Sequence, residues 1–164
     1  MMKRRGFSLL ELILVIVLTT VLTASVVSVY LTSIKIWNAG EDRTGLRTSL
    51  ALSVDMITQD LSNATNISLE NVDNSLYFNK DGLGYRWYLY SADDPGQAYN
   101  NDNISYDLIK TVVNDTYVYG MGTVWATGIQ RSVFAYANNL VTVDMTATKN
   151  STIVHVRTKI RPRN

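Results

Sequence analysis

The stretch that decides the fold runs from Lys3 to Ile34 and reads KRRGFSLLELILVIVLTTVLTASVVSVYLTSI. Its last 23 residues, 12–34, contain no charged side chain. A helix of that length spans about 34 Å at about 1.5 Å per residue, enough to cross a hydrocarbon core of about 30 Å. Because a backbone in lipid must satisfy its own hydrogen bonds, we expect this segment to be helical despite its many β-branched residues.

Small hydroxyl side chains are scattered through this apolar segment. Their hydroxyls can donate to carbonyl groups of the preceding helical turn. Small residues also let a second helix approach closely, so the segment is expected to pack on other helices. The seven residues are Thr19, Thr20, Thr23, Ser25, Ser28, Thr32 and Ser33.

The flanking charges predict the orientation of the segment. Lys3, Arg4 and Arg5 precede it, whereas Lys35 follows it with a mixture of both signs beyond. The denser basic cluster is expected to stay in the cytoplasm, which exports the remainder of a single-pass protein of the cytoplasmic (inner) membrane. A plain signal anchor explains these features too. A cleaved secretory signal fits poorly, because its apolar core would be about 7–15 residues long.

One acidic side chain, Glu11, lies inside the apolar run. A carboxylate within a membrane segment costs about 2.5–3.5 kcal/mol on insertion scales, and such residues are functional candidates. A single anchor would gain nothing from this glutamate. We therefore expect a partner to supply a cation to Glu11.

Residues 3–12, KRRGFSLLEL, followed by the long apolar helix, resemble the class III signal of type IV pilins and type II secretion pseudopilins. The resemblance implies that a prepilin peptidase cuts after Gly6 and methylates the new N-terminal residue, Phe7. It also implies that Glu11 is the family's glutamate at the fifth position of the mature chain. Ser8 stands where threonine is more usual in the family.

The resemblance further implies a non-enzymatic filament subunit and a set of partners. These are the prepilin peptidase, other pilin or pseudopilin subunits, an inner-membrane assembly platform, and membrane lipid before assembly. After assembly the subunit would stand in an extracytoplasmic filament. Secretion, DNA uptake, adhesion and motility stay open as roles. A plain membrane-anchored exported domain and an anchored ligand-binding protein or enzyme stay open as alternatives.

A second helical pattern follows the membrane segment. Apolar residues recur at spacings of three and four, which predicts an amphipathic helix packed on a sheet and ending near residues 63–66. Residues 50–64 are similar to the helix end of larger minor pilins and J-type minor pseudopilins. The stripe consists of Leu46, Leu50, Val54, Ile57, Leu61 and Ala64, and the residues expected mostly off it are Arg43, Arg47, Asp55, Gln59 and Asp60.

The remainder of the chain shows strand patterns separated by turn residues. Strands are predicted at residues 76–78, 85–91, 106–113, 116–119, 130–137, 140–148 and 152–160. Asn138-Asn139 and Lys149-Asn150-Ser151 separate the last three, which indicates an antiparallel meander. In the last pair of strands, every second residue should face the helix, starting at Val141 in one strand and at Val154 in the other. Charged side chains should point outward, namely Asp144, His155, Arg157 and Lys159.

These patterns predict an α+β fold in which a long N-terminal helix packs its second half on an antiparallel β-sheet head. The predicted parts are a leader peptide at residues 1–6, a membrane-spanning or filament-core helix at 7–36, an amphipathic continuation at 37–65, and an exported β-rich head at 66–164.

Composition narrows the chemistry of the chain. The 164 residues include no cysteine and one histidine, and the net charge is +1. The lack of a basic excess gives no support for direct nucleic-acid binding. Asp93, Asp94 and Asp102 could offer oxygen ligands to Ca²⁺, but their spacing matches no EF-hand, and a solvated turn is the simpler interpretation. No other cofactor and no catalytic residue is predicted. The aromatic strand YRWYLYS at residues 85–91 could stack a ligand, although core packing explains most of it.

Overall fold

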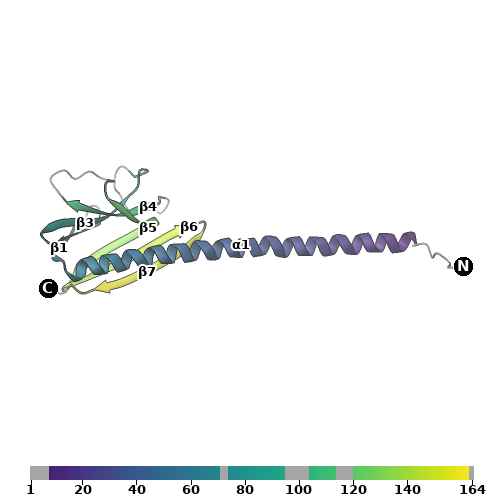
Figure 1. Ribbon diagram of the computed structural model, residues 1–164, viewed down its shortest axis with the longest axis horizontal. Helices are drawn as coiled ribbons and strands as arrows, with labels where there is room; N and C mark the ends of the chain where they lie inside the picture. The colour runs from purple at the N-terminus through teal and green to yellow at the C-terminus, as the bar shows by residue number, and fades with distance from the viewer. Residues whose placement is uncertain (1–7, 71–73, 95–103, 114–119, 163–164) are drawn as a thin grey trace. The chain divides into compact units, whose positions relative to one another are not determined.

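The computed structural model describes residues 8–70, 74–94, 104–113 and 120–162. One helix, α1 (Leu9–Ser62), precedes the strands in the chain (Figure 1). The chain divides into two compact units, Met1–Gly40 and Glu41–Asn164. The strands are β1 (Thr65–Glu70), β2 (Ser75–Lys80), β3 (Leu83–Tyr90), β4 (Tyr106–Val113), β5 (Thr123–Ala137), β6 (Leu140–Lys149) and β7 (Thr152–Ile160).

The first unit contributes only helix to the described part of the chain. Every residue from Ser8 to Gly40 is exposed there, including the long apolar side chains of the membrane segment. In the described residues, α1 is long and apolar enough to cross a membrane. The helical conformation expected for residues 12–34 is therefore confirmed.

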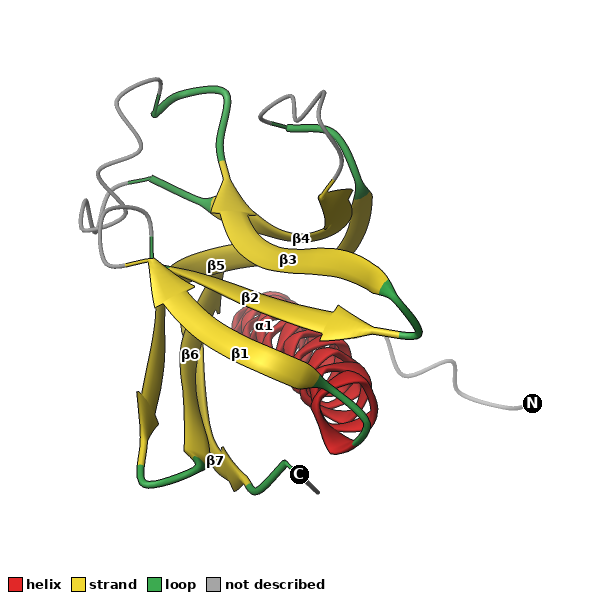
Figure 2. Cartoon of the chain, turned by 90° about the vertical axis from the view of Figure 1, so that its left-hand side faces the viewer, coloured by secondary structure: helices red, strands yellow, loops and turns green. Residues whose placement is uncertain are grey.

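The second unit is the head, and its seven strands form one sheet in chain order, each antiparallel to the next. Figure 2 shows the sheet curving round the part of α1 that belongs to this unit. The predicted α+β class and the predicted meander of the last three strands are both confirmed. The predicted strand at residues 116–119 lies outside the described residues.

Three tight turns set the register of the hairpins. Both central residues have positive φ in Asp81-Gly82, in Asn138-Asn139 and in Asn150-Ser151. That conformation belongs to type I′ turns, whose twist matches the twist of the flanking strands, and asparagine, aspartate and glycine adopt it most readily. The turn residues recognised in the sequence therefore lie where β5–β6 and β6–β7 reverse direction, and Asp81-Gly82 forms the corresponding turn between β2 and β3.

One face of α1 forms the core of the head. Leu50, Ile57 and Leu61 are fully buried, and Leu46 is nearly so. Burying each such side chain stabilises the fold by about 1.5–3 kcal/mol. The predicted stripe is confirmed except at Val54, which is half-buried while the neighbouring Ser53 is fully buried.

The strands opposite the helix alternate as predicted. Val141, Val143, Met145 and Ala147 of β6 are fully buried. On β7, Val154 and Val156 are half-buried, whereas His155 is exposed and turned to the other face. The period-two pattern of this pair thus places its apolar face on the core.

Two elements differ from the sequence-based expectation. β1 forms where an asparagine-rich stretch after the helix showed no strand pattern, because pairing with β2 supplies hydrogen bonds that the local sequence does not announce. β5 begins at Thr123 rather than at Gln130, since Gly128 adopts φ +77° and the register between β4 and β5 shifts across it. A bulge at a glycine lets the strand continue through a residue that looks like a break.

Asp42 begins the buried face of α1 within the head. Its Oδ1 pairs with Lys149 Nζ at 3.0 Å, and its Oδ2 accepts a hydrogen bond from Asn150 Nδ2 at 2.9 Å. The hydrogen bonds from Asn150 and Lys149 and the positive charge of Lys149 lower the pKa of Asp42 below its ordinary 3.8, against the opposing effect of burial. The ionised carboxylate therefore joins the helix to the β6–β7 turn.

The lowered pKa of Asp42 predicts a pH-dependent contribution to stability. Because the folded pKa is below the unfolded one, the contribution is present above the unfolded pKa and is lost as the pH falls through the folded value. We expect Asp42→Asn to lower the urea midpoint of the full chain in detergent at pH 7, and the difference from wild type to shrink towards pH 3. A difference that does not change between these pH values would contradict the ion pair. Glu41→Gln, at an exposed neighbouring position, is the control.

Candidate functional site: the N-terminal helix

The start of α1 is a capping box. The backbone N–H of Ser8 donates to Glu11 Oε2 at 3.1 Å, and the N–H of Leu10 donates to Ser8 Oγ at 3.4 Å. The glutamate thus satisfies the N–H of the serine three positions earlier, as in a capping box, while the serine hydroxyl caps the N–H of the second helical residue. The negative charge of Glu11 also lies at the positive end of the helix dipole, which favours a carboxylate. Glu11 is therefore oriented by its own chain while it stays exposed.

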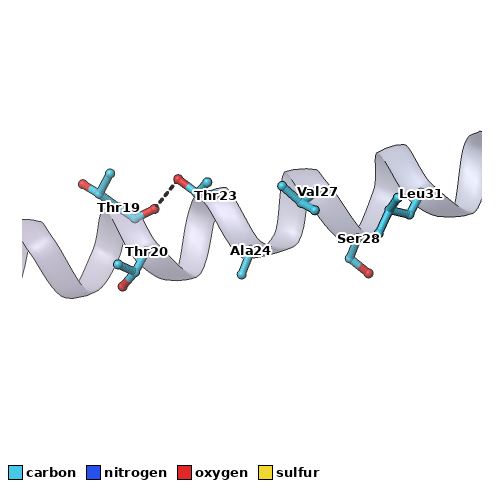
Figure 3. Close-up of a pocket in the computed structure, with 7 residues that line it drawn as sticks. All are labelled: Thr19, Thr20, Thr23, Ala24, Val27, Ser28 and Leu31. Carbon is cyan, nitrogen blue, oxygen red and sulfur yellow. Dashed lines mark hydrogen bonds between the residues drawn. The ribbon is translucent and has the colours of Figure 1, made fainter.

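The hydroxyl side chains of the apolar segment bond back along the helix. Thr19 Oγ1 donates to the carbonyl of Val15 at 2.7 Å, and Thr23 Oγ1 donates to that of Thr19 at 2.8 Å (Figure 3). Thr20, Ser25, Thr32 and Ser33 donate to carbonyls three or four residues earlier. The expectation that these hydroxyls satisfy themselves is thus confirmed for six of the seven. They can lie in an apolar environment without an outside hydrogen-bond partner.

One side of this helix carries a shallow groove where small side chains predominate. Figure 3 shows the side chains that line it, which come from successive turns. Small residues lower the surface of a helix locally and allow another helix to pack closely. The lining residues are Thr19, Thr20, Thr23, Ala24, Val27, Ser28 and Leu31.

The residues of the predicted processing site are only partly within the described chain. Gly6 and Phe7 lie outside the described residues, so their predicted cleavage and methylation stay predictions. Glu11 lies in the first turn of α1, four residues after Phe7 in the chain. Ser8, which sequence reasoning treated as a mild departure from the family, takes part in the capping box. The Ser-x-x-Glu spacing was the signal that could have identified it.

The three calcium candidates do not form a described site. Asp94 is buried and accepts a hydrogen bond from Tyr106 Oη at 2.8 Å, whereas Asp93 is exposed. Asp102 lies outside the described residues. No three histidine, cysteine, aspartate or glutamate side chains within the described ranges come close enough together to hold a metal ion.

The aromatic strand β3 is packed on both faces. Trp87 and Tyr88 are fully buried although they point to opposite sides of the sheet. Tyr88 Oη donates to the carbonyl of Met121 at 2.9 Å and accepts from the N–H of Gly120 at 3.1 Å. The guanidinium of Arg86 lies 5.0 Å from the ring centres of both Tyr77 and Tyr88. Packing and hydrogen bonding within the head therefore account for the two central aromatic side chains.

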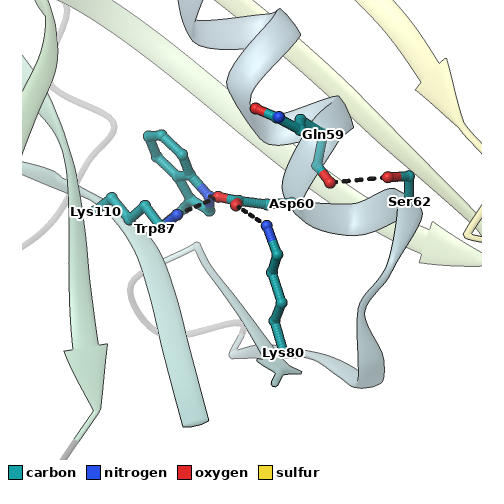
Figure 4. A network of polar contacts seen from close by, with 6 residues as sticks. All are labelled: Gln59, Asp60, Ser62, Lys80, Trp87 and Lys110. Carbon is teal, nitrogen blue, oxygen red and sulfur yellow. Dashed lines mark hydrogen bonds and ion pairs between the residues drawn. The ribbon is translucent and has the colours of Figure 1, made fainter. Parts of the chain in front are cut away.

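A buried carboxylate cluster joins the end of α1 to three strands. Asp60 is 2% exposed, and its Oδ1 pairs with Lys80 Nζ at 3.2 Å. Its Oδ2 pairs with Lys110 Nζ at 2.6 Å and accepts from Trp87 Nε1 at 3.2 Å (Figure 4). The three donors come from β2, β4 and β3 respectively. Two cations and an indole N–H compensate the burial of this one carboxylate.

The prediction that Asp60 lies off the buried stripe is therefore wrong. Continuing the spacing of three and four residues from Ile57 leads to Asp60 as well as to Leu61. We expected Asp60 to be exposed because acidic side chains are almost never fully buried unless they are paired. The pairing lysines stand far along the chain on separate strands, and no local pattern linked them to the helix.

Comparison with known proteins identifies the N-terminal segment. Residues 1–27 match the family model described as the prokaryotic N-terminal methylation motif. The chain thus carries the class III signal of the type IV pilin and pseudopilin family. A search of the curated proteins and a search of the solved structures found no significant match to this chain.

The motif and the apolar helix together support a membrane-anchored protein of the type IV pilin-like or pseudopilin class. The family motif points to a structural subunit. A class III signal implies processing by a prepilin peptidase and assembly with other pilin subunits.

The Asp60 cluster predicts a large effect of one substitution on stability. Asp60→Ala leaves Lys80 and Lys110 facing each other without their anion, which should destabilise the head by about 3 kcal/mol. This loss of stability is at the low end of the range for breaking a buried ion pair, because both lysine side chains are partly exposed to solvent. Urea unfolding of the full chain in detergent measures the loss. Asp55→Ala, at an exposed position of the same helix, should change stability by less than about 0.5 kcal/mol. Equal effects of the two variants would contradict the role of the cluster.

Proposed function

We propose that this chain is a non-enzymatic structural subunit, a minor pilin or pseudopilin, of a type IV pilus-like filament. Prepilin peptidase removes residues 1–6 on the cytoplasmic side of the inner membrane, and Phe7 becomes the methylated N-terminus. The subunit then leaves the bilayer and assembles through its N-terminal helix. The observation that carries the proposal is a single acid, Glu11, at the start of an exposed apolar helix within the matched residues 1–27.

The charge on Glu11 favours assembly with a neighbour that supplies a cation. The Ser8 N–H orients one oxygen of this carboxylate but brings no positive charge. A lone ionised carboxylate in hydrocarbon is costly, whereas one that meets a cation is partly compensated. In the mature chain the nearest new cation is the amino group of Phe7, which stays charged after methylation. We infer that the amino group of one subunit pairs with Glu11 of its neighbour in the filament.

The rest of the helix supports close packing between subunits. Six of the seven Ser and Thr hydroxyl groups in its apolar segment donate to the backbone of the same helix, so they need no hydrogen-bond acceptor from lipid or from a neighbouring helix. Its apolar side chains are exposed in the single chain. Moving that surface from lipid into a bundle of like helices replaces lipid contacts with protein contacts, and the shallow groove at Thr19 to Leu31 allows near approach.

The proposal also covers where the filament is assembled and where the head is located. The filament would be built at an inner-membrane assembly platform and serve secretion, DNA uptake, adhesion or motility. The similarity of residues 50–64 to J-type minor pseudopilins favours a minor component. Exposure of the head outside the cytoplasmic membrane follows from the basic cluster Lys3, Arg4 and Arg5.

Cleavage is the first test. In cells with an active prepilin peptidase, mass spectrometry should find a mature chain that begins at N-methylated Phe7. Gly6→Leu should abolish the cleavage, because a bulky side chain obstructs access to the peptide bond, whereas Ser8→Thr should be processed as efficiently as wild type. A plain membrane anchor would instead retain residues 1–6 in the presence of the active enzyme, and that result would overturn the proposal.

Two substitutions at Glu11 separate its charge from its hydrogen bond. Glu11→Gln keeps an oxygen that can accept from Ser8, while Glu11→Ala removes both. If pairing with the amino group matters, both variants should be cleaved but should enter sheared filaments at least tenfold less than wild type, since about 1.4 kcal/mol corresponds to a factor of ten.

The control is Glu41→Gln, an exposed acid beyond the membrane segment, which should assemble normally. Normal incorporation of Glu11→Gln with impaired incorporation of Glu11→Ala would assign Glu11 to helix capping alone. Because methylation can depend on the same residue, the methyl group is measured separately by mass spectrometry.

A further inference from the structure

The head contains a groove between its helix and the last strand of its sheet. The groove has a volume of about 510 Å³, and Arg43 and Arg47 of α1 line one side. Residues 153–157 of β7 line the other side. All of these residues belong to the unit Glu41–Asn164. The groove is therefore a feature of the head by itself.

The β7 side of the groove is an open strand edge. β7 is last in the sheet order, so no strand of the described chain lies beyond it. Lys149 and Thr152 close a two-residue turn and form a hydrogen-bonded pair, and such pairs alternate along an antiparallel hairpin. The N–H and C=O groups of Ile153, His155 and Arg157 therefore point away from β6. They are the groups that a further strand would use.

The charge around this edge is positive. No acidic residue follows Asp144 in the chain, and Asp144 itself pairs with His155 Nε2 at 2.7 Å and lies 3.7 Å from Arg157 Nε. Arg43 and Arg47 are exposed and have no acidic partner among the residues that the structure describes. Two unpaired guanidinium groups thus flank an unpaired strand edge.

We propose that this groove binds an extended acidic segment of another protein chain, which adds to the sheet as a strand beside β7. Its backbone would pair with Ile153, His155 and Arg157. Its acidic side chains would alternate towards Arg43 and Arg47 on the helix side, and its other side chains would lie beside Ile153, which is 65% exposed. Alternation at period two turns one face of the segment towards the two arginines of the helix and the other towards the outer face of β7, where Ile153 lies beside His155 and Arg157.

Charged residues on an edge strand protect a sheet from aggregation, and His155, Arg157 and Lys159 of β7 can serve in that way. Such protection does not require charges on a neighbouring helix. Here Arg43 and Arg47 come from the helix and face the strand across the groove. Guanidinium groups in that position complement carboxylates on an added strand. The charge pattern therefore favours a specific occupant over simple protection.

A designed peptide tests the proposal on the full-length chain in detergent micelles. The probe is a fluorescein-labelled octapeptide of four Glu-Val repeats, and its binding is followed by anisotropy. It should bind, and amide hydrogen exchange should slow at residues 153–157. A Lys-Val repeat should not bind. A Glu-Val peptide methylated on alternate backbone nitrogens should bind at least tenfold more weakly, because it keeps the charge but cannot pair along the strand.

Substitutions in the chain provide a second test of the groove. Arg43→Glu combined with Arg47→Glu should weaken binding of the Glu-Val peptide at least tenfold, and Arg43→Gln with Arg47→Gln should weaken it less. Arg131→Glu, an exposed arginine on β5 and two strands from the edge, is the matched control and should leave affinity within twofold of wild type.

Several outcomes would overturn the proposal. They are absence of binding, equal binding of the methylated peptide, or an equal effect of Arg131→Glu. Self-association of the chain that the Glu-Val peptide does not displace would assign the edge to a second copy instead. All of these measurements are independent of cleavage after Gly6 and of filament entry, so failure here leaves the proposed function untouched.

Discussion

Burial of one face of α1 against the sheet is the constraint on which the head depends. From Asp42 to Ala64 the buried positions follow the helical spacing of three and four residues. The sheet curves round the helix to cover this face, and each of its strands pairs with the next one along the chain. The apolar middle of the face supplies most of the stabilisation, because Leu50, Ile57 and Leu61 lose all contact with water.

The same buried face carries a carboxylate near each end. Asp42 meets Lys149 and Asn150 at the β6–β7 turn, and Asp60 meets cations from β2 and β4. Apolar contacts along a helix allow some sliding, whereas a buried charge has few acceptable positions. We infer that the two carboxylates define the axial position of the helix within the sheet. The more deeply buried of them, Asp60, contacts three different strands at once.

The N-terminal helix differs from the head in that its apolar side chains are not buried within the chain. It has no core of its own, and its apolar side chains are exposed in the single chain. Six of the seven Ser and Thr hydroxyl groups in its apolar segment donate to the preceding turn, and the capping box at Ser8 and Glu11 satisfies backbone N–H groups at its start. Such a helix is suited to an apolar environment, in which the carboxylate of Glu11 needs a compensating cation.

Local sequence patterns determined much of this protein. The uncharged run at residues 12–34 required a helix, the stripe beginning at Leu46 required a covering layer, and pairs such as Asn138-Asn139 required tight turns. These features depend on neighbours within about one turn or one hairpin. Tertiary structure alone decided that β1 pairs with β2, that Asp60 is buried, and that β7 presents an open edge to Arg43 and Arg47. Asp60 and its lysines, like Arg43 and β7, are far apart in the chain, so no local pattern links them. β1 lies close to β2 in the chain, but its strand conformation depends on the pairing and not on a pattern of its own.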